Sequence, residues 1–388
     1  MNTRKIVFLT VDFPPIGGGI SRYLYNIVRY FPVKNLKVLG LPSSGWQEFD
    51  QEQKFCIVRL GLPLEGMSHR IQTRCSFPFY LGRLRQEDNV SYILGGQSHI
   101  FLMLSAWIFM RLKKIPYGVC AHGNDLLTPQ SRFYRHLFNY LLQNAKVVFV
   151  NSTPTSGIAK SLGVKSTKIH VVQPGIDTTT TISRITAENI KQHYGIIDKK
   201  CILTVGRLVV RKGHDIVIQA LPKVLKAIPD LHYLIVGTGA HEESLKSLIC
   251  NLGMEDHVTF AGFVPEEVLG AYYQACDVFV MVSREIPEKG DIEGFGIVYL
   301  EANLRGKPIV AGHSGGVTDA VVHGKTGLLV NPTDPNEVAE SLVNLLTDKQ
   351  LAEQLGKAGR ERVLKNFSSV KTSQKVQTIL STEIENNS

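Results

Sequence analysis

The sequence predicts an α/β protein built from two doubly wound domains, each with a parallel sheet covered by helices on both faces. Its 388 residues are long enough for two complete cores, and 44% hydrophobic with 20% charged residues is a globular composition. Short β-branched runs alternate with amphipathic stretches along the chain, which is typical of parallel sheets. The series is interrupted once, at residues 171–181, where Pro174 and Gly175 precede a run of threonines.

Each predicted strand is a short apolar run bounded by polar or turn residues. In the first half, strands are expected at 5–11, 35–40, 55–60, 117–121, 146–150 and 168–172. In the second half, they are expected at 201–206, 232–237, 257–262, 277–282 and 307–312. We therefore place the first domain at 1–173 and the second at 174–365, followed by a helical tail at 366–388.

The net charge of +9 is unevenly distributed. Residues 1–175 contain 21 Lys and Arg against 8 Asp and Glu, whereas the remainder contains 22 against 26. The first half is therefore expected to meet an anionic partner, unless the surplus is only a solvated surface. The cations that carry this interpretation are interspersed with aromatic residues: Arg70, Arg74, Arg83, Arg85, Arg111, Lys113, Lys114, Arg132 and Arg135. An anionic membrane surface fits this mixture, and no nucleic-acid motif accompanies it, so nucleic acid is not expected as a partner.

The six cysteines show no metal-type spacing, and three of them lie in or beside apolar strand-like runs. This pattern favours a reducing cytosol. The apolar run at the N-terminus breaks at Asp12, too early for a signal peptide, and the longest apolar run, 100–110, is too short to span a bilayer. We expect a cytoplasmic protein, peripheral on the inner face of the membrane if the basic surface binds lipid.

Ligands of open parallel sheets bind beyond the carboxyl ends of the strands, so the loops there are the places to search. In the second domain, Arg207 and Lys212 follow a predicted strand and precede a helix. Two such cations can hold a pyrophosphate, although either could be an ordinary surface charge.

The stretch "EGFGIVYLE" gives a more specific prediction, because it places Glu293 before a glycine turn and Glu301 about five residues into a helix. A helix that starts after glycines binds phosphate through its N–H groups, and a carboxylate can accept hydrogen bonds from paired hydroxyls. The order matches a nucleotide sugar: sugar hydroxyls, diphosphate, ribose hydroxyls. The alternatives are two solvated glutamates or, less compatible with the crowded helix end, a glycosidase pair.

The chain resembles the retaining glycosyltransferases of family 4, which have the GT-B fold of two Rossmann-like domains facing across a cleft. The motifs that carry the resemblance run in the family's order over nearly the whole chain: "PPIGGGISRY", "AHGND", "PGID", "VGRLVVRKG", "VGTG", "GFV", the E-x7-E stretch and "GGVTDAV…GKTGLLV". The resemblance implies that Arg207 and Lys212 hold the donor diphosphate and that Glu301 binds the ribose. It also implies that the final helix crosses back to the first domain.

Further donor contacts follow from the same resemblance. Glu293 and the backbone of Phe295, Gly296 and Ile297 are expected to bind the sugar and phosphate. The segment Phe263–Val264 is expected to meet the base.

In the first domain, Gly17, Gly18 and Gly19 precede a helix, either as a plain flexible turn or as a loop that approaches a phosphate or sugar. The resemblance places this loop, including Gly18 and Gly19, near the donor. His122 follows a strand and is either a structural hydrogen bonder or, as the resemblance implies, a catalytic residue facing the donor sugar. Asp125 is expected to orient it or to cap the next helix.

The predicted reaction moves a hexose from a nucleotide diphosphate sugar to a lipid-linked or saccharide acceptor hydroxyl, keeping the anomeric configuration. GDP-mannose is favoured over UDP-glucose and UDP-N-acetylglucosamine by family likeness of the 283–302 stretch. The catalytic group is expected to comprise His122, Glu293, Arg207 and Lys212, with no cofactor and no metal, since the chain has no D-x-D. A GT-B-type nucleotide-sugar epimerase, a pyridoxal-phosphate phosphorylase and a non-catalytic nucleotide-sugar binding protein remain as alternatives.

Overall fold

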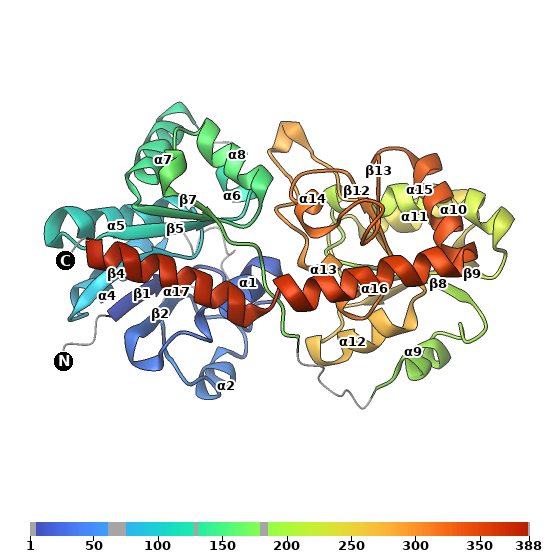
Figure 1. Cartoon of the computed structure of the whole chain (residues 1–388), viewed down its shortest axis with the longest axis horizontal. Coiled ribbons are helices and arrows are strands. Elements are labelled where there is room, and N and C mark those ends of the chain that lie inside the picture. The colour runs from blue at the N-terminus through green and yellow to red at the C-terminus, as the bar shows by residue number, and fades with distance from the viewer. Residues whose placement is uncertain (1–4, 61–74, 128–130, 179–184, 387–388) are drawn as a thin grey trace. The chain divides into compact units, whose positions relative to one another are not determined.

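The computed structural model describes residues 5–60, 75–127, 131–178 and 185–386. The chain forms two compact units, Met1–Gly175 with Ser369–Ser388, and Ile176–Ser368 (Figure 1). Each unit contains a parallel sheet flanked by helices, so the predicted fold class is confirmed.

The first unit contains a seven-stranded sheet in the order β3-β2-β1-β4-β5-β6-β7. Its strands are β1 (Lys5–Leu9), β2 (Leu36–Gly40), β3 (Cys56–Arg59), β4 (Val90–Gly95), β5 (Tyr117–Ala121), β6 (Val147–Val150) and β7 (Ile169–Val171). Its helices are α1 (Gly19–Val28), α2 (Trp46–Gln51), α4 (Phe77–Arg85), α5 (Ile100–Lys113), α6 (Asn124–Leu127), α7 (Arg132–Asn144), α8 (Thr153–Ser161) and α17 (Ser369–Asn386).

Two buried clusters cover the two faces of this sheet. Helices α4, α5 and α7 pack on one face, where Tyr80, Phe109 and Phe138 are fully or almost fully buried. Helices α1 and α17 pack on the other face through residues such as Ile27 and Val376. The last helix is thus part of the first unit, although more than 190 residues separate it from the preceding strand of that unit.

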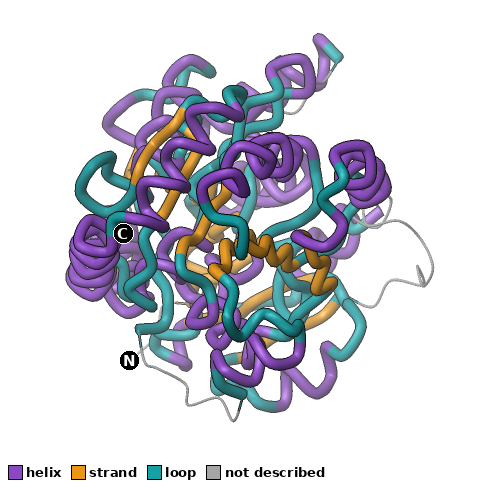
Figure 2. The backbone as a smooth tube through the Cα atoms, turned by 90° about the vertical axis from the view of Figure 1, so that its right-hand side faces the viewer, coloured by secondary structure: helices purple, strands orange, loops and turns teal. Residues whose placement is uncertain are grey.

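The second unit contains a six-stranded sheet in the order β10-β9-β8-β11-β12-β13. Its strands are β8 (Lys200–Val205), β9 (Leu231–Val236), β10 (Val258–Gly262), β11 (Val278–Met281), β12 (Ile309–Gly312) and β13 (Leu328–Val330). Its helices are α9 (Ala187–His193), α10 (His214–Ala227), α11 (Glu242–Leu252), α12 (Glu266–Ala275), α13 (Ile297–Leu304), α14 (Val317–Ala320), α15 (Pro335–Thr347) and α16 (Lys349–Asn366). Figure 2 shows the strands, in orange, enclosed by helices, in purple.

The strand predictions were incomplete in each half. All eleven predicted strands are present within one or two residues of their expected bounds, but β4 and β13 were missed. Strand β4 pairs with both β1 and β5 and is the central strand of the first sheet. Among the described residues, no helix is both long and apolar enough to cross a membrane.

Candidate functional site

The candidate site lies at the carboxyl edge of the second sheet, where the strand order changes direction between β8 and β11. Such a switch point is where doubly wound sheets bind their ligands, because the loops on its two sides diverge. The loop after β8 leads through a short 3-10 helix, Val210–Lys212, into α10. The loop after β11 runs from Val282 to Gly296 and leads into α13.

Glycines let these loops pack backbone against backbone. Gly213 has a φ of +73°, and a Cβ atom built on it would lie 2.2 Å from the carbonyl oxygen of Val282. A Cβ on Gly316 would lie 1.9 Å from the carbonyl oxygen of Gly294. No larger residue fits at either position without moving a main chain, so the loops after β8, β11 and β12 are fixed relative to one another.

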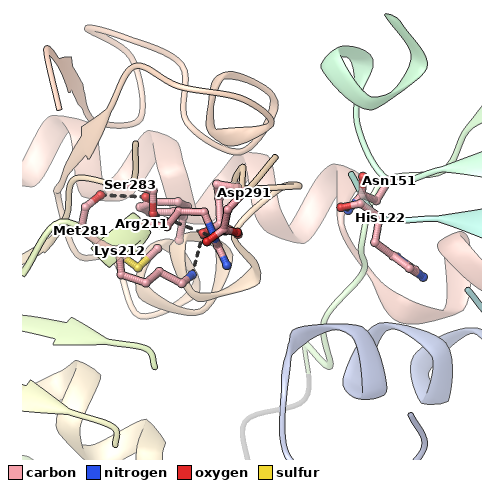
Figure 3. A network of polar contacts seen from close by, with 9 residues as sticks. His122, Asn151, Arg211, Lys212, Met281, Ser283 and Asp291 are labelled. Atoms are coloured by element: carbon pink, nitrogen blue, oxygen red, sulfur yellow. Dashed lines mark hydrogen bonds and ion pairs between the residues drawn. The ribbon is translucent and has the colours of Figure 1, made fainter. Parts of the chain in front are cut away.

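Two cations from the loop after β8 hold the side chain of Glu293, and Figure 3 labels both of them, Arg211 and Lys212. Its Oε2 lies 2.6 Å from Nη1 of Arg211 and 2.6 Å from Nζ of Lys212. Ser283 donates a third hydrogen bond to the same oxygen, at 3.2 Å. Nε of Arg211 also lies 2.7 Å from Oδ1 of Asp291, so one guanidinium joins two carboxylates of the loop after β11, Asp291 and Glu293.

Burial and charge act in opposite directions in this cluster. Burial alone would raise the pKa of Glu293, but Lys212 and Arg211 outweigh it and lower the pKa to about 2. Burial lowers the pKa of Lys212, although Glu293 acts against this. The pKa of Arg211 is raised, because the two carboxylates overcome the opposing effect of burial. Glu293 and Arg211 are therefore ionised near neutral pH, and this pair stays charged.

A buried histidine lies beside this cluster at the start of α10. His214 is 1% exposed, and neither of its ring nitrogens has a hydrogen-bond partner among the described residues. Burial, assisted by the charge of Lys212, lowers its pKa to about 3. The imidazole is therefore neutral at physiological pH.

Helix α13 starts without a side-chain cap, directly after Gly296, which has a φ of +88°. Its first backbone N–H groups therefore remain available to an anion. Phe295 and Ile297 are buried in the core, with Phe295 against the ring of Phe367, so their contribution to such a site is their main chain. Glu301, the fifth residue of the helix, is half-buried and accepts a hydrogen bond from the hydroxyl of Tyr273 at 2.7 Å.

The other residues that the sequence analysis predicted on the donor side also follow strands of this sheet. Arg207 follows β8 and is exposed, and its side chain forms no hydrogen bond or ion pair within the described part of the chain. Phe263 follows β10 and is 76% exposed, which is unusual for an aromatic side chain, and Val264 is half-buried beside it. Exposure of a large apolar side chain at a ligand-binding edge is typical of a stacking surface.

Sequence reasoning did not identify four further side chains in or beside the candidate site. These residues are Arg211, His214, Tyr273 and Ser283. Arg211 precedes Lys212 directly, and the burial of one of two adjacent cations cannot be read from sequence alone. Tyr273 looks like any aromatic residue of an amphipathic helix.

In the first unit, His122 lies at the carboxyl end of β5 and is 5% exposed. Its Nε2 is 2.7 Å from the carbonyl oxygen of Gly96, which can only accept, so Nε2 carries the hydrogen. The ring packs edge-on against Tyr23, with 5.4 Å between centroids, and Asn151 donates a hydrogen bond to the His122 carbonyl (Figure 3).

Asp125 acts on backbone rather than on the imidazole. Its carboxylate accepts hydrogen bonds from the N–H of His122, at 2.8 Å, and from the N–H of Ser98, at 3.0 Å. It therefore ties the loop after β5 to the loop after β4. Gly17, Gly18 and Gly19 lead into α1, as expected from the sequence, and Gly18 has a φ of +138° with open space where a side chain would be.

The described residues contain no group of three His, Cys, Asp or Glu side chains arranged to hold a metal ion. Metal independence itself stays a prediction.

Comparison with known proteins gives two family matches. A family model described as glycosyl transferases group 1 matches residues 186–362, and one described as glycosyltransferase family 4 matches residues 17–180. Together they cover most of both units.

Similar proteins extend over almost the whole chain. The chain is 32% identical to the GDP-mannose-dependent alpha-(1-6)-phosphatidylinositol monomannoside mannosyltransferase of Mycolicibacterium smegmatis, over 93% of this chain and 94% of the relative. It is 26% identical to the D-inositol 3-phosphate glycosyltransferase of Corynebacterium diphtheriae, over 98% and 95%. Among solved structures, Anabaena HepE in complex with UDP-glucose matches with a TM-score of 0.81 at 22% identity, over 97% of this chain and 99% of that one.

Proposed function

The chain belongs to the glycosyltransferases that the group 1 and family 4 models describe, enzymes of the GT-B type, and we propose that it is a retaining mannosyltransferase. In this proposal it transfers mannose from GDP-mannose to a hydroxyl of a lipid-linked acceptor. The donor and acceptor are suggested by relatives, among them the mannosyltransferase that is 32% identical. A mannosylated phosphatidylinositol is the first acceptor to test.

The observation that carries the donor proposal is the cluster of cations beside the uncapped start of α13. Arg211 and Lys212 contact Glu293 there, and Arg207 is exposed nearby in sequence on the same loop. Because Asp291 and Glu293 together carry two negative charges, three cations leave the cluster with a net positive charge. A diphosphate would complete this balance while accepting hydrogen bonds from the N–H groups of the helix.

The same arrangement supplies catalysis. As the bond between the anomeric carbon and the leaving oxygen breaks, negative charge grows on the diphosphate. Lys212, paired with Glu293, and the N–H groups of α13 are fixed in place before the reaction, so they stabilise that charge without reorganisation, and the exposed guanidinium of Arg207 adds to them. Glu293, held by Arg211 and Ser283, is proposed to accept hydrogen bonds from the sugar through its remaining lone pairs.

A leaving diphosphate neutralised in this way does not require a divalent cation. We therefore propose that transfer is metal-independent. Activity should be unchanged in EDTA, and a loss that Mg²⁺ or Mn²⁺ restores would contradict the proposal.

The acceptor side is proposed to include a membrane surface. Helices α4, α5 and α7 pack beside one another and together carry six Arg or Lys and no Asp or Glu. Large apolar side chains are exposed among these charges: Phe79, Leu112, Phe133, Tyr134 and Tyr140. Cations attract anionic headgroups, and exposed aromatic side chains enter the interface of the bilayer. Arg70 and Arg74, also expected to contribute, lie outside the described residues.

Two assays test the proposed function. A thermal-shift screen with GDP, UDP and ADP sugars should show the largest stabilisation with GDP-mannose, since binding to the native state alone raises its stability. Radiolabelled mannose should then appear in the lipid fraction when phosphatidylinositol mannosides are added, in the α configuration. Stabilisation by UDP-glucose alone would overturn the donor, and release of free sugar without lipid labelling would overturn the acceptor.

Flotation tests the membrane surface. The protein should float with vesicles containing anionic phosphatidylinositol and remain unbound with neutral phosphatidylcholine. The variant Leu112→Ser/Phe133→Ser should bind less, whereas Ile197→Ser, an exposed apolar residue of the second unit, should bind as the wild type does. Equal flotation of all three proteins would contradict the proposal.

A further inference from the structure

We propose that Tyr273 is a positioning residue that fixes the carboxylate of Glu301 for the vicinal ribose hydroxyls, and so sets the preference of the site for ribonucleotides. This inference rests on the proposed function, in which Glu301 binds the ribose. The structure contributes the hydrogen bond of 2.7 Å from the Tyr273 hydroxyl to Oε2 of Glu301.

The ring of Tyr273 is anchored in the core. Tyr273 lies in α12 and is 2% exposed. The ring contacts Phe279 of β11, with 5.7 Å between centroids, and Phe279 in turn packs at right angles against Tyr299 of α13. The hydroxyl therefore extends from a ring that is held by buried aromatic residues of the sheet and of the same helix that carries Glu301.

Glu301 has the opposite character, because it is half-buried with three rotatable bonds in its side chain. A vicinal diol is bound well only when both carboxylate oxygens face it, so the plane of the carboxylate matters as much as its position. A free glutamate would have to lose its rotamer freedom when the nucleotide binds. The hydrogen bond from Tyr273 restricts Oε2 beforehand, and ordering the carboxylate before binding increases affinity.

A neighbouring residue supplies a matched control. Tyr272, the preceding residue of α12, is 8% exposed, and its hydroxyl lies 3.0 Å from the hydroxyl of Tyr194. The change Tyr272→Phe thus removes one hydroxyl and one hydrogen bond from the same helix without touching Glu301. Any effect on α12 alone should be common to Tyr272→Phe and Tyr273→Phe.

The experiment measures the affinity of each variant for each ligand by titration calorimetry. The ligands are GDP and 2′,3′-dideoxy-GDP, and the matching UDP pair. We expect Tyr273→Phe to weaken binding of the ribonucleotide about fivefold, the loss associated with one ordered side chain. It should leave the affinity for the dideoxynucleotide within twofold. Tyr272→Phe should change neither affinity, and Glu301→Ala should weaken the ribonucleotide further while sparing the dideoxy form.

The outcomes separate this inference from the proposed function. Equal weakening of both nucleotides by Tyr273→Phe, with a lowered melting temperature, would assign the tyrosine a purely structural role and overturn the inference. An unchanged ribonucleotide affinity would also overturn it. If the wild type binds the ribonucleotide and the dideoxynucleotide of each pair with equal affinity, Glu301 does not bind the ribose. If it binds neither GDP nor UDP, the donor proposal itself fails.

Discussion

The carboxyl edges of the two sheets differ in how their polar groups are held. In the second unit, Glu293 lies between Arg211, Lys212 and Ser283, so charge is paired with charge in a mostly buried environment. In the first unit, the equivalent edge is organised by hydrogen bonds to backbone, as when His122 contacts the carbonyl of Gly96. Both edges follow the same kind of doubly wound parallel sheet.

Under the proposed function, this difference lets one topology serve two kinds of ligand. A cationic cluster next to a helix start suits a diphosphate, whose charge must be balanced while it leaves. An edge organised by hydrogen bonds to backbone suits hydroxyl groups, which need direction more than a balancing charge. Changes on the second edge should therefore affect nucleotide binding and transfer together, and changes on the first should affect transfer alone.

The largest effect is expected for Lys212→Ala on the second edge. Losing a fixed cation at a developing negative charge should lower kcat/KM about 10³-fold, at the upper end of what one such donor supplies. Steady-state transfer from GDP-mannose measures this. Lys223→Ala is the control, because Lys223 forms an exposed ion pair with Glu340 and lies on α10, away from the loop after β11. A loss of kcat/KM below tenfold in Lys212→Ala would contradict the role assigned to the second edge.

On the first edge, His122→Ala should lower kcat about 10²-fold, the contribution of a positioned polar group. The Kd for GDP, measured by calorimetry, should remain within threefold, since His122 belongs to the unit without the cationic cluster. His136→Ala, an exposed histidine of α7, should leave both quantities unchanged. A nucleotide affinity that falls in proportion to kcat would show that the edges do not divide their roles in this way.

The next effect concerns stability rather than turnover. Arg211→Met should lower the free energy of unfolding by about 3 kcal/mol, because Asp291 and Glu293 lose a buried cationic partner. Urea unfolding measures it, and Lys223→Met should change stability by less than about 0.5 kcal/mol. If both variants unfold at the same urea concentration, the cluster is not held by its ion pairs.

The smallest effect is a dependence on pH that arises from His214. Its folded pKa of about 3 lies below the ordinary value of 6.5, so the unfolded chain binds the proton first as pH falls. Wild-type stability should therefore decrease below pH 6.5, with a contribution from His214 of about 1.4 kcal/mol per pH unit. In His214→Gln, that part of the slope between pH 6.5 and 5 should disappear. An identical slope in both proteins would contradict a buried neutral imidazole.

Much of the fold could be predicted because apolar runs between helices carry the signal of a buried parallel strand. Strand β4 was missed because "VSYILG" directly follows the polar stretch 86–89 and has Ser91 as its second residue, so the local pattern does not mark it as the centre of a sheet. Strand β13 has three residues and lies at the sheet edge, so its apolar run is too short to mark it as a strand.

Candidate site residues are most readily predicted where a motif places them close together in sequence. Glu293, Gly296 and Glu301 share one helix entry and were proposed from it. Arg211 meets its two carboxylates across some 80 residues of chain, and Tyr273 meets Glu301 across 28. These contacts depend on tertiary packing, which local periodicity does not contain.

A crystal structure with bound GDP-mannose tests the central claim most directly. The diphosphate should lie within hydrogen-bonding distance of Lys212, Arg207 and the first N–H groups of α13, with the ribose hydroxyls on Glu301. A nucleotide bound at any other edge of the second sheet, or a ribose pointing away from Glu301, would contradict the claim.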